Sequence, residues 1–113
     1  MSQSKTAKIG KQTFTVRELT LREIKSLTEG LEESAVDALI NLLTISTTAK
    51  PEDLTEHAPS EIKEFIDAML EVNSPFFDMA EAAQMKQSAD ALRHLIRSIF
   101  LTSFLSSSKE ATE

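Results

Sequence analysis

Cysteine is absent from this 113-residue chain, and glycine and proline are scarce, with two and three residues respectively. Without cysteine, disulfide frameworks, thiolate metal sites and cysteine nucleophiles are excluded. So few turn formers disfavour a β-sandwich or barrel, in which short strands are separated by frequent turns. The two glycines, Gly10 and Gly30, stand alone and cannot form a glycine-rich phosphate loop. Trp and Tyr are also absent, so six Phe are the only aromatic side chains.

Long hydrophobic runs are missing as well. The longest apolar stretch, residues 38–45, is short and includes Asn41 and Thr44, so it cannot span a bilayer. The N-terminal residues have no apolar core of the kind that signal peptides contain. From the sequence we therefore expect a soluble, cytoplasmic protein with no membrane association, built as one domain of ordinary globular composition.

The net charge is −6, and its distribution along the chain is uneven. Residues 1–25 hold six basic and two acidic side chains, whereas residues 26–85 hold two basic and thirteen acidic ones. An acidic centre of this size repels phosphate backbones, so we expect no nucleic-acid binding. The favoured interpretation is that these charges solvate the surface. The alternative is that the basic end of one copy contacts the acidic middle of the next, a head-to-tail contact that generates rings or spirals.

Residues 1–6 are polar and are predicted to be flexible, and residues 7–18 are predicted to form a short β-hairpin. Apolar and polar residues alternate on both sides of a Gly-Lys pair, which is typical of two paired strands. A lone hairpin is only marginally stable, so its apolar face must lie on helices or on another copy. Four residues in or near this basic segment are therefore candidates for self-assembly: Phe14, Val16, Arg17 and Arg22.

Helix signals follow the hairpin. Thr20 and Glu23 have the spacing of a capping box, which predicts a helix that ends near Gly30. Its predicted buried stripe consists of Leu21, Ile24, Leu27 and Leu31. Ser34 is predicted to cap a second helix, which the polar run at residues 46–48 closes.

Three further helices are predicted after residue 50. A loop at residues 50–59, with room for one helical turn, leads to a helix from Ser60 to residues 72–73 that has a clear apolar stripe. Ser74 is predicted to cap the next helix, with Pro75 at its first position. A long last helix is predicted over residues 88–105, before a flexible polar tail at residues 106–113. The expected fold is mainly α, a small bundle of about five helices with an N-terminal hairpin, in a single domain of residues 7–105.

Residues that could carry catalysis or bind a metal are isolated. His57 and His94 have no second histidine at metal-binding spacing. The serines lie in helix caps or in the tail, without the Gly-x-Ser-x-Gly arrangement of hydrolases. Carboxylate pairs such as Glu61 and Glu64 usually mark a solvated helix face. We therefore expect no enzyme, catalytic residue, cofactor or metal, and a hydrolase with an unrecognised carboxylate site is the least favoured alternative.

Apolar side chains in the second half of the chain are better candidates for function. Adjacent helical positions lie about 100° apart, so one of Phe76 and Phe77 is expected to enter the core and the other to meet a neighbouring element or a partner. Packing of both rings in one small core is the more ordinary outcome. The end of the predicted last helix has a similar excess of apolar residues. The candidate partner-binding residues are Phe76, Phe77, Phe100 and Phe104.

Two segments resemble one known protein family. In the first, residues 8–24, a hairpin is followed by a Val-x-Glu-Leu-Thr type helix start that runs from Val16 to Thr20. In the second, residues 59–77, a helix runs into a Val-Asn-x-x-Phe-Phe turn. Together they cover about a third of the chain and are similar to small tail assembly chaperones of long-tailed bacteriophages or prophages.

The resemblance implies a helical protein that binds the long tape measure protein of the tail, keeps it soluble and helps to bring tail tube subunits onto it. Such chaperones act in the host cytoplasm, are absent from the finished virion and often form spiral multimers. The partners implied are therefore the tape measure protein, the tail tube protein and further copies of the chain in a spiral or ring. The runner-up is a small helical adaptor or regulatory protein that acts by protein–protein binding.

Overall fold

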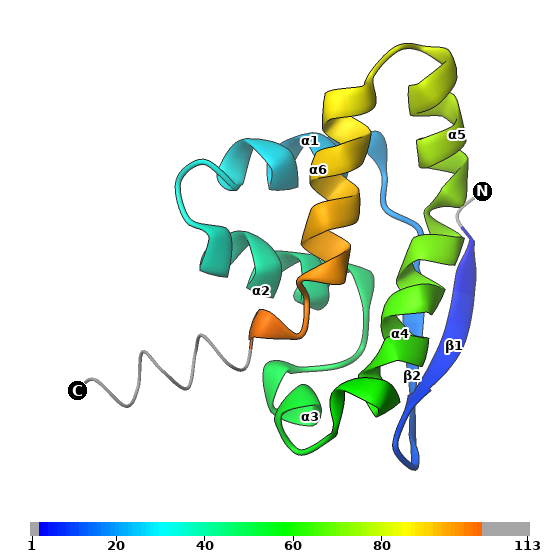
Figure 1. The fold of residues 1–113 in the computed structure, drawn as a ribbon, viewed down its shortest axis with the longest axis vertical. Coiled ribbons are helices and arrows are strands. Elements are labelled where there is room, and N and C mark those ends of the chain that lie inside the picture. Colours follow the sequence, from blue (N-terminus) through cyan, green and yellow to red (C-terminus); the bar gives the residue numbers. More distant parts are fainter. Residues whose placement is uncertain (1–2, 103–113) are drawn as a thin grey trace.

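A computed structural model describes residues 3–102, which form a mainly α domain with a small two-stranded antiparallel sheet (Figure 1). Six helices lie within these residues, one more than predicted, because the single turn expected in the loop after residue 50 is a separate short helix. Phe104 and the predicted tail lie outside the described residues. The elements in chain order are β1 (Ser4–Ile9), β2 (Gln12–Arg17), α1 (Leu21–Gly30), α2 (Ala35–Ser46), α3 (Pro51–Thr55), α4 (Pro59–Val72), α5 (Ser74–Ala82) and α6 (Lys86–Arg97).

The hairpin is longer than predicted. Its register runs from the pair Ser4 and Arg17 to the pair Ile9 and Gln12, so residues 4–6 are part of β1 and the prediction of a flexible segment up to residue 6 is wrong for them. These residues are polar and exposed, but their backbone pairing with β2 needs no apolar side chain. Gly10 begins the two-residue turn with a φ of 63°, a backbone conformation that residues with a Cβ rarely adopt.

The hairpin is held between two parts of the helical domain. One face packs on α4, where Ala7, Ile9 and Val16 are buried, and the ring of Phe14 meets that of Phe65 edge-on at 6.3 Å between centroids. The outer edge of β2 pairs with the chain that leaves α2, through the Thr48 N–H to Thr15 C=O hydrogen bond of 3.0 Å. The sheet therefore belongs to the core of this chain.

Both predicted caps near the N-terminus are confirmed. At the start of α1, Thr20 Oγ1 accepts from the Glu23 N–H at 3.2 Å, and the Glu23 carboxylate accepts from the Thr20 N–H at 2.9 Å. At the start of α2, Ser34 Oγ accepts from the Asp37 N–H at 3.2 Å. Each bond satisfies an amide that has no partner inside its helix.

The helices of the second half depart from prediction at several boundaries. Helix α4 begins at Pro59, one residue earlier than predicted, and α6 begins at Lys86, two residues earlier. Ser74 is the first residue of α5 instead of its cap, because Asn73 occupies the capping position. α6 ends at Arg97, so one continuous helix over residues 88–105 is wrong. The Ile99 N–H donates to Ile96 C=O at 3.2 Å, a bond across three residues that tightens the chain into a turn.

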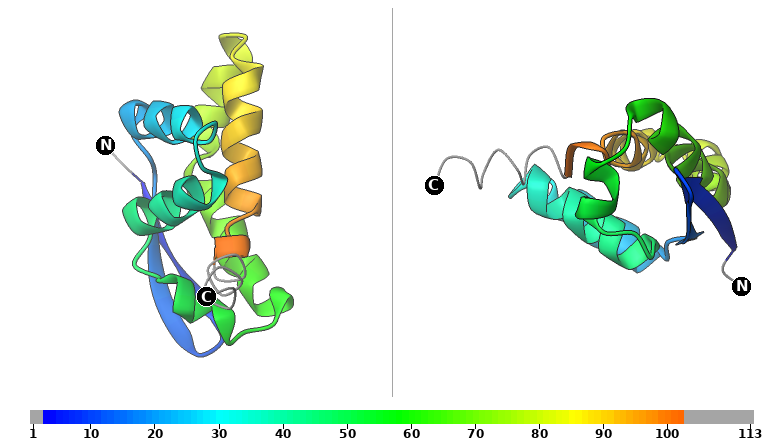
Figure 2. Two further views of the ribbon diagram at one scale, coloured as in Figure 1. Left: turned by 90° about the vertical axis from the view of Figure 1, so that its left-hand side faces the viewer. Right: turned by 90° about the horizontal axis from the view of Figure 1, so that it is seen from below.

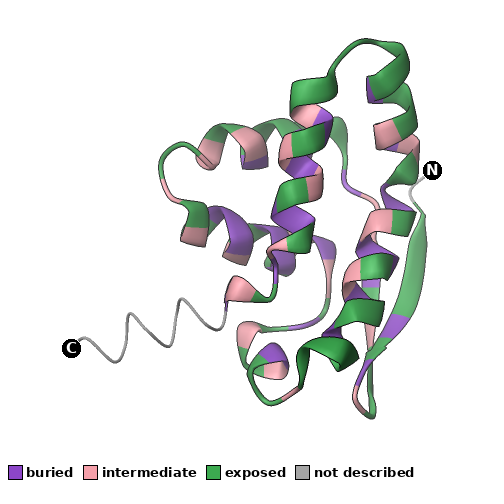
Figure 3. Ribbon diagram, in the orientation of Figure 1, coloured by how far each residue is buried: buried purple, intermediate pink, exposed green. Residues whose placement is uncertain are grey.

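Helix α6 lies at the centre of the helical part and contacts α1, α2, α4 and α5 (Figure 1). Its buried stripe faces the other helices, while its opposite side is exposed (Figure 3). Helices α1 and α2 form a hairpin on one side of α6, and α4 and the sheet lie on the other side (Figure 2). The largest fully buried apolar side chains are Ile9, Val16, Leu42, Leu43, Phe65, Met69, Leu92, Leu95, Ile96 and Ile99.

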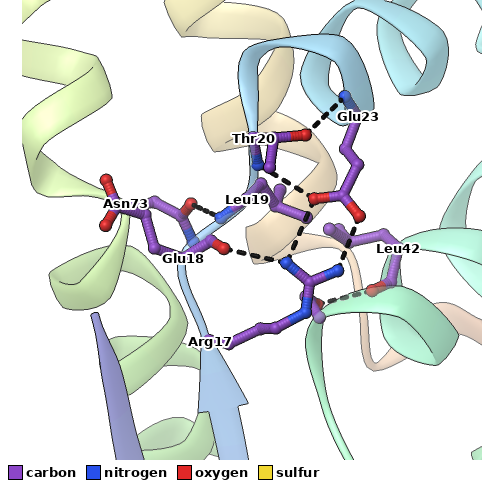
Figure 4. Close-up of polar contacts among 8 residues, drawn as sticks. Arg17, Glu18, Leu19, Thr20, Glu23, Leu42 and Asn73 are labelled. Carbon is purple, nitrogen blue, oxygen red and sulfur yellow. Dashed lines mark hydrogen bonds and ion pairs between the residues drawn. The ribbon is translucent and has the colours of Figure 1, made fainter. Parts of the chain in front are cut away.

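Asn73 is a buried polar residue between α4 and α5, with none of its surface exposed. Its Oδ1 accepts from the Leu19 N–H at 2.9 Å (Figure 4). Its Nδ2 donates to Met69 C=O at 2.8 Å. The first bond joins the segment between β2 and α1 to the junction of α4 and α5. It thereby brings together the two segments that carry the sequence resemblance, since Leu19 and Asn73 are 54 residues apart in the chain.

Replacing Asn73 with Ala should leave the Leu19 N–H buried without a partner. The expected loss in the free energy of unfolding is about 1–3 kcal/mol, measured by urea unfolding followed by far-ultraviolet circular dichroism. Ser74→Ala, an exposed neighbour, is the matched control and should change stability by less than about 0.5 kcal/mol. Equal stability of the two variants would contradict this role for Asn73.

Gly10→Ala should also destabilise the fold, for two separate reasons. The positive φ costs about 1–2 kcal/mol for a residue with a Cβ, and that Cβ would lie 2.4 Å from His57 Cε1. The same change made in a His57→Ala background should cost less, because the contact with the imidazole ring is gone. An equal loss in both backgrounds would show that the ring contact contributes nothing.

Candidate protein-binding surface

The structure separates the phenylalanines predicted to bind a partner. Phe76 is in the core, whereas Phe77 is half-buried and meets the ring of Phe76 edge-on at 5.9 Å between centroids. The guanidinium carbon of Arg93 lies over the Phe77 ring, 4.5 Å from its centroid, so Phe77 meets α6 as a neighbouring element. Phe100 is 46% exposed and is the one described member of the four that is open to solvent.

Most of the residues predicted for self-assembly make contacts inside this chain. Val16 is fully buried, so its assignment as an intersubunit contact is wrong, because it forms part of the core and pairs with Thr47 after α2. Phe14 packs on α4, as described above. Arg17 donates to both carboxylate oxygens of Glu23, at 3.1 and 2.6 Å (Figure 4). Of the four, Arg22 is exposed, and no ion pair is found for it among residues 3–102.

The Arg17–Glu23 pair fixes the charge state of the α1 N-terminus. Hydrogen bonds from the Arg17 guanidinium lower the pKa of Glu23 to about 2, against an ordinary value of 4.5, and the Thr20 N–H adds to this effect. The same pairing raises the pKa of Arg17. The carboxylate also lies at the positive end of the α1 dipole, which favours its charged form.

The basic N-terminal strand is likewise engaged with an acidic helix of its own chain. Lys5 forms an ion pair with Glu71 on α4, and the Lys8 N–H donates to the Glu64 carboxylate at 3.1 Å. Part of the uneven charge of the sequence is therefore matched within one molecule. These contacts do not use the acidic side chains of residues 26–49, on the far side of the fold.

An apolar depression, which we call the α1–α5 hollow, opens between the start of α1 and α5. Its volume is about 360 Å³, and its apolar lining consists of Leu19, Leu21, Pro75, Phe76 and Met79. Leu21 is 60% exposed and Met79 is 43% exposed. The prediction that Leu21 belongs to the buried stripe of α1 is wrong, because this first helical residue lies at the edge of the core, whereas Ile24 and Leu27 are buried.

Two further grooves lie between neighbouring helices. The groove between α5 and α6 has a volume of about 410 Å³ and is partly closed by Arg93, which also pairs with Asp90 at 3.1 Å. The groove between α1 and α2 is larger, about 580 Å³. With the α1–α5 hollow, these depressions give the helical part of the molecule several places where apolar side chains of another protein could enter.

The polar groups of the described residues do not assemble into a metal centre. Among residues 3–102, no three His, Cys, Asp or Glu side chains are placed so that they could hold a metal ion. His57 Nδ1 lies 3.3 Å from the Glu61 carboxylate at the start of α4, against the hairpin turn. Within the same range, no helix has the length and apolar character needed to cross a membrane.

The exposed members of the hollow could not be found from sequence. Leu21 and Met79 have the hydrophobicity of core residues, and their exposure depends on how α1 meets α5, which a local pattern does not encode.

Comparison with protein-family models, curated proteins and solved structures finds no match for this chain.

The low pKa of Glu23 predicts how stability changes with pH. Its contribution is present above the ordinary pKa of 4.5 and is lost as the pH falls toward about 2. Glu23→Gln should therefore be less stable than the original chain at pH 6 by about 1 kcal/mol, the upper range for a solvent-accessible pair. The difference should shrink as the pH falls and vanish once the pH is below the folded-state pKa of about 2. Urea unfolding at several pH values measures this.

Arg17→Met is the companion variant. In this variant too the free energy of unfolding should fall less steeply at acid pH. The effect should be smaller than for Glu23→Gln, because the Thr20 N–H still bonds to the Glu23 carboxylate. A Glu23→Gln variant whose stability falls with acid as steeply as that of the original chain would contradict this assignment.

Proposed function

We propose that this chain is a tail assembly chaperone of a long-tailed bacteriophage or prophage. It binds the tape measure protein, keeps it soluble in the host cytoplasm and promotes assembly of the tail tube around it, without catalysis. Several copies associate along one tape measure protein as a spiral or ring, and the chaperone leaves before the virion is complete.

The observation that supports this proposal most is the meeting of the two resembling segments. Leu19, in the first segment, and Asn73, in the second, are joined by the buried 2.9 Å hydrogen bond. The α1–α5 hollow lies directly beside that contact, because Leu21 and Pro75 are each two residues further along the chain. The sequence pattern behind the resemblance thus surrounds an exposed apolar depression.

The shape and chemistry of the surface also suit a helical client. A long helical protein that is insoluble alone exposes apolar stripes, and such stripes dock in shallow apolar grooves between helices. Leu21, Met79 and Phe100 offer exposed apolar surface for that purpose. Binding of this kind needs shape and hydrophobicity more than any reactive group.

Co-expression with the long helical protein encoded beside its own gene tests the proposal. We expect the client to become soluble and to carry many copies of the chain, as measured by light scattering of the purified complex. A monomeric chain that leaves the client insoluble would contradict the proposal and favour the adaptor interpretation.

The same assay tests the hollow with the double variant Leu21→Asp, Met79→Lys. Asp at the first position of α1 is compatible with the helix dipole, so the fold should persist while the amount of bound client falls at least tenfold. Met85→Lys is the matched control, since Met85 is also 43% exposed but lines none of the three depressions described here. Equal binding by the double variant would exclude the hollow as the client site.

A further inference from the structure

The groove between α1 and α2, which we call the α1–α2 groove, has a largely apolar lining and open space beside Gly30. Leu27, Ala38 and Ile45 supply the apolar side chains, and the volume is about 580 Å³. Leu27 and Ala38 are already buried, whereas Ile45 is half-buried. Figures 1 and 2 show α1 and α2 as a hairpin beside α6.

Gly30 leaves room in this groove for a side chain from another molecule. It lines the groove at the end of α1, and a Cβ built on it would have no atom within 4 Å. Gly30 is also a regular helical residue, so its lack of a side chain is not required by the backbone. Small residues at a helix surface allow a second helix to approach closely.

The charge along the groove is uneven, with carboxylates gathered toward the α1–α2 connection. Between Lys25 and Lys50 the chain has four carboxylates, Glu29, Glu32, Glu33 and Asp37, and no Lys or Arg. Glu33 and Asp37 line the groove itself, and none of the four forms an ion pair within residues 3–102. Arg22 lies on the lining as well, toward the start of α1. The end of the groove at the α1–α2 connection is therefore acidic.

We infer that the α1–α2 groove is a docking site for an amphipathic helix that carries Lys or Arg beside its apolar stripe, at the end that lies against Glu33 and Asp37. The apolar stripe would pack on Leu27 and Ile45 and cover Gly30. This inference rests on the proposed function, because it specifies which kind of helix in the client the chain binds.

A client helix fits this groove better than a second copy of the chain. The helices of this chain turn their apolar stripes toward their own core, and four of its cations, Lys5, Arg17, Lys63 and Arg93, are already in ion pairs. Complementary charge raises the rate and the specificity of docking more than its strength, so the acidic end would select which helix of a client is bound.

Two synthetic peptides of about 14 residues, long enough for about four helical turns, test the inference. Both have the same Leu and Ala stripe and one Trp, and they differ in carrying Lys or Glu beside the stripe at one end. Because the chain has no Trp or Tyr, Trp fluorescence reports on the peptide alone. We expect the Lys peptide to bind at least tenfold more tightly than the Glu peptide, and added salt to reduce the difference. Equal affinities would overturn the inference.

Substitutions at Gly30 locate the site. Gly30→Phe should fill the groove and weaken binding of the Lys peptide at least tenfold, whereas Gly30→Ala, the matched control, should bind as the original chain does. Circular dichroism checks that both variants are folded. If Gly30→Phe is not folded, amide chemical shifts of the original chain decide, since the Lys peptide should then perturb α1 and α2 and leave α3 unchanged. Perturbation confined to other helices would overturn the inference.

Charge variants separate selectivity from packing. Glu33→Gln with Asp37→Asn should remove most of the advantage of the Lys peptide, whereas Glu52→Gln with Glu56→Gln, on and just after α3, should not. In the co-expression assay, a Gly30→Phe chain that solubilises the client as well as the original would overturn the groove and leave the proposed function standing. A chain that binds the Lys peptide but does not bind the client would support the groove and contradict the proposed function.

Discussion

The hydrogen bond from the Leu19 N–H to the buried amide of Asn73 is the contact on which the rest of the arrangement depends. It ties the segment between β2 and α1 to the junction of α4 and α5, so the direction of α1 relative to α5 follows from it. A buried amide without this partner would carry the full cost of desolvation. The α1–α5 hollow lies beside this bond, and Leu19, Leu21 and Met79 are part of its lining.

Local signals in the sequence were sufficient for most helix boundaries. Thr20 and Ser34 cap their helices because the bonds involved span three residues. Properties that depend on contacts between distant segments were not predictable in this way. Val16 lies in the core and pairs with Thr47 after α2, and Leu21 is exposed although it is apolar. Helix α6 ends earlier than predicted, and the Ile99 N–H after it bonds to Ile96 C=O, three residues back.

The charges of the chain have two different uses in the fold. The basic β1 strand and the acidic α4 helix meet within one molecule, through the ion pair of Lys5 with Glu71 and through the Lys8 backbone N–H, which donates to the Glu64 carboxylate. The carboxylates around the α1–α2 connection form no ion pair among residues 3–102. Two of these carboxylates, Glu33 and Asp37, line the α1–α2 groove, where their charge can act on a bound segment.

Binding of a helical client through apolar side chains beside the Leu19–Asn73 contact is tested most directly by methyl NMR of the chain with labelled methionine. Met69 is fully buried, whereas Met79 and Met85 are both 43% exposed. On addition of the client, we expect the Met79 signal to shift or broaden and the Met85 signal to stay unchanged. A bound client that perturbs Met85 and leaves Met79 unchanged would show that it binds elsewhere.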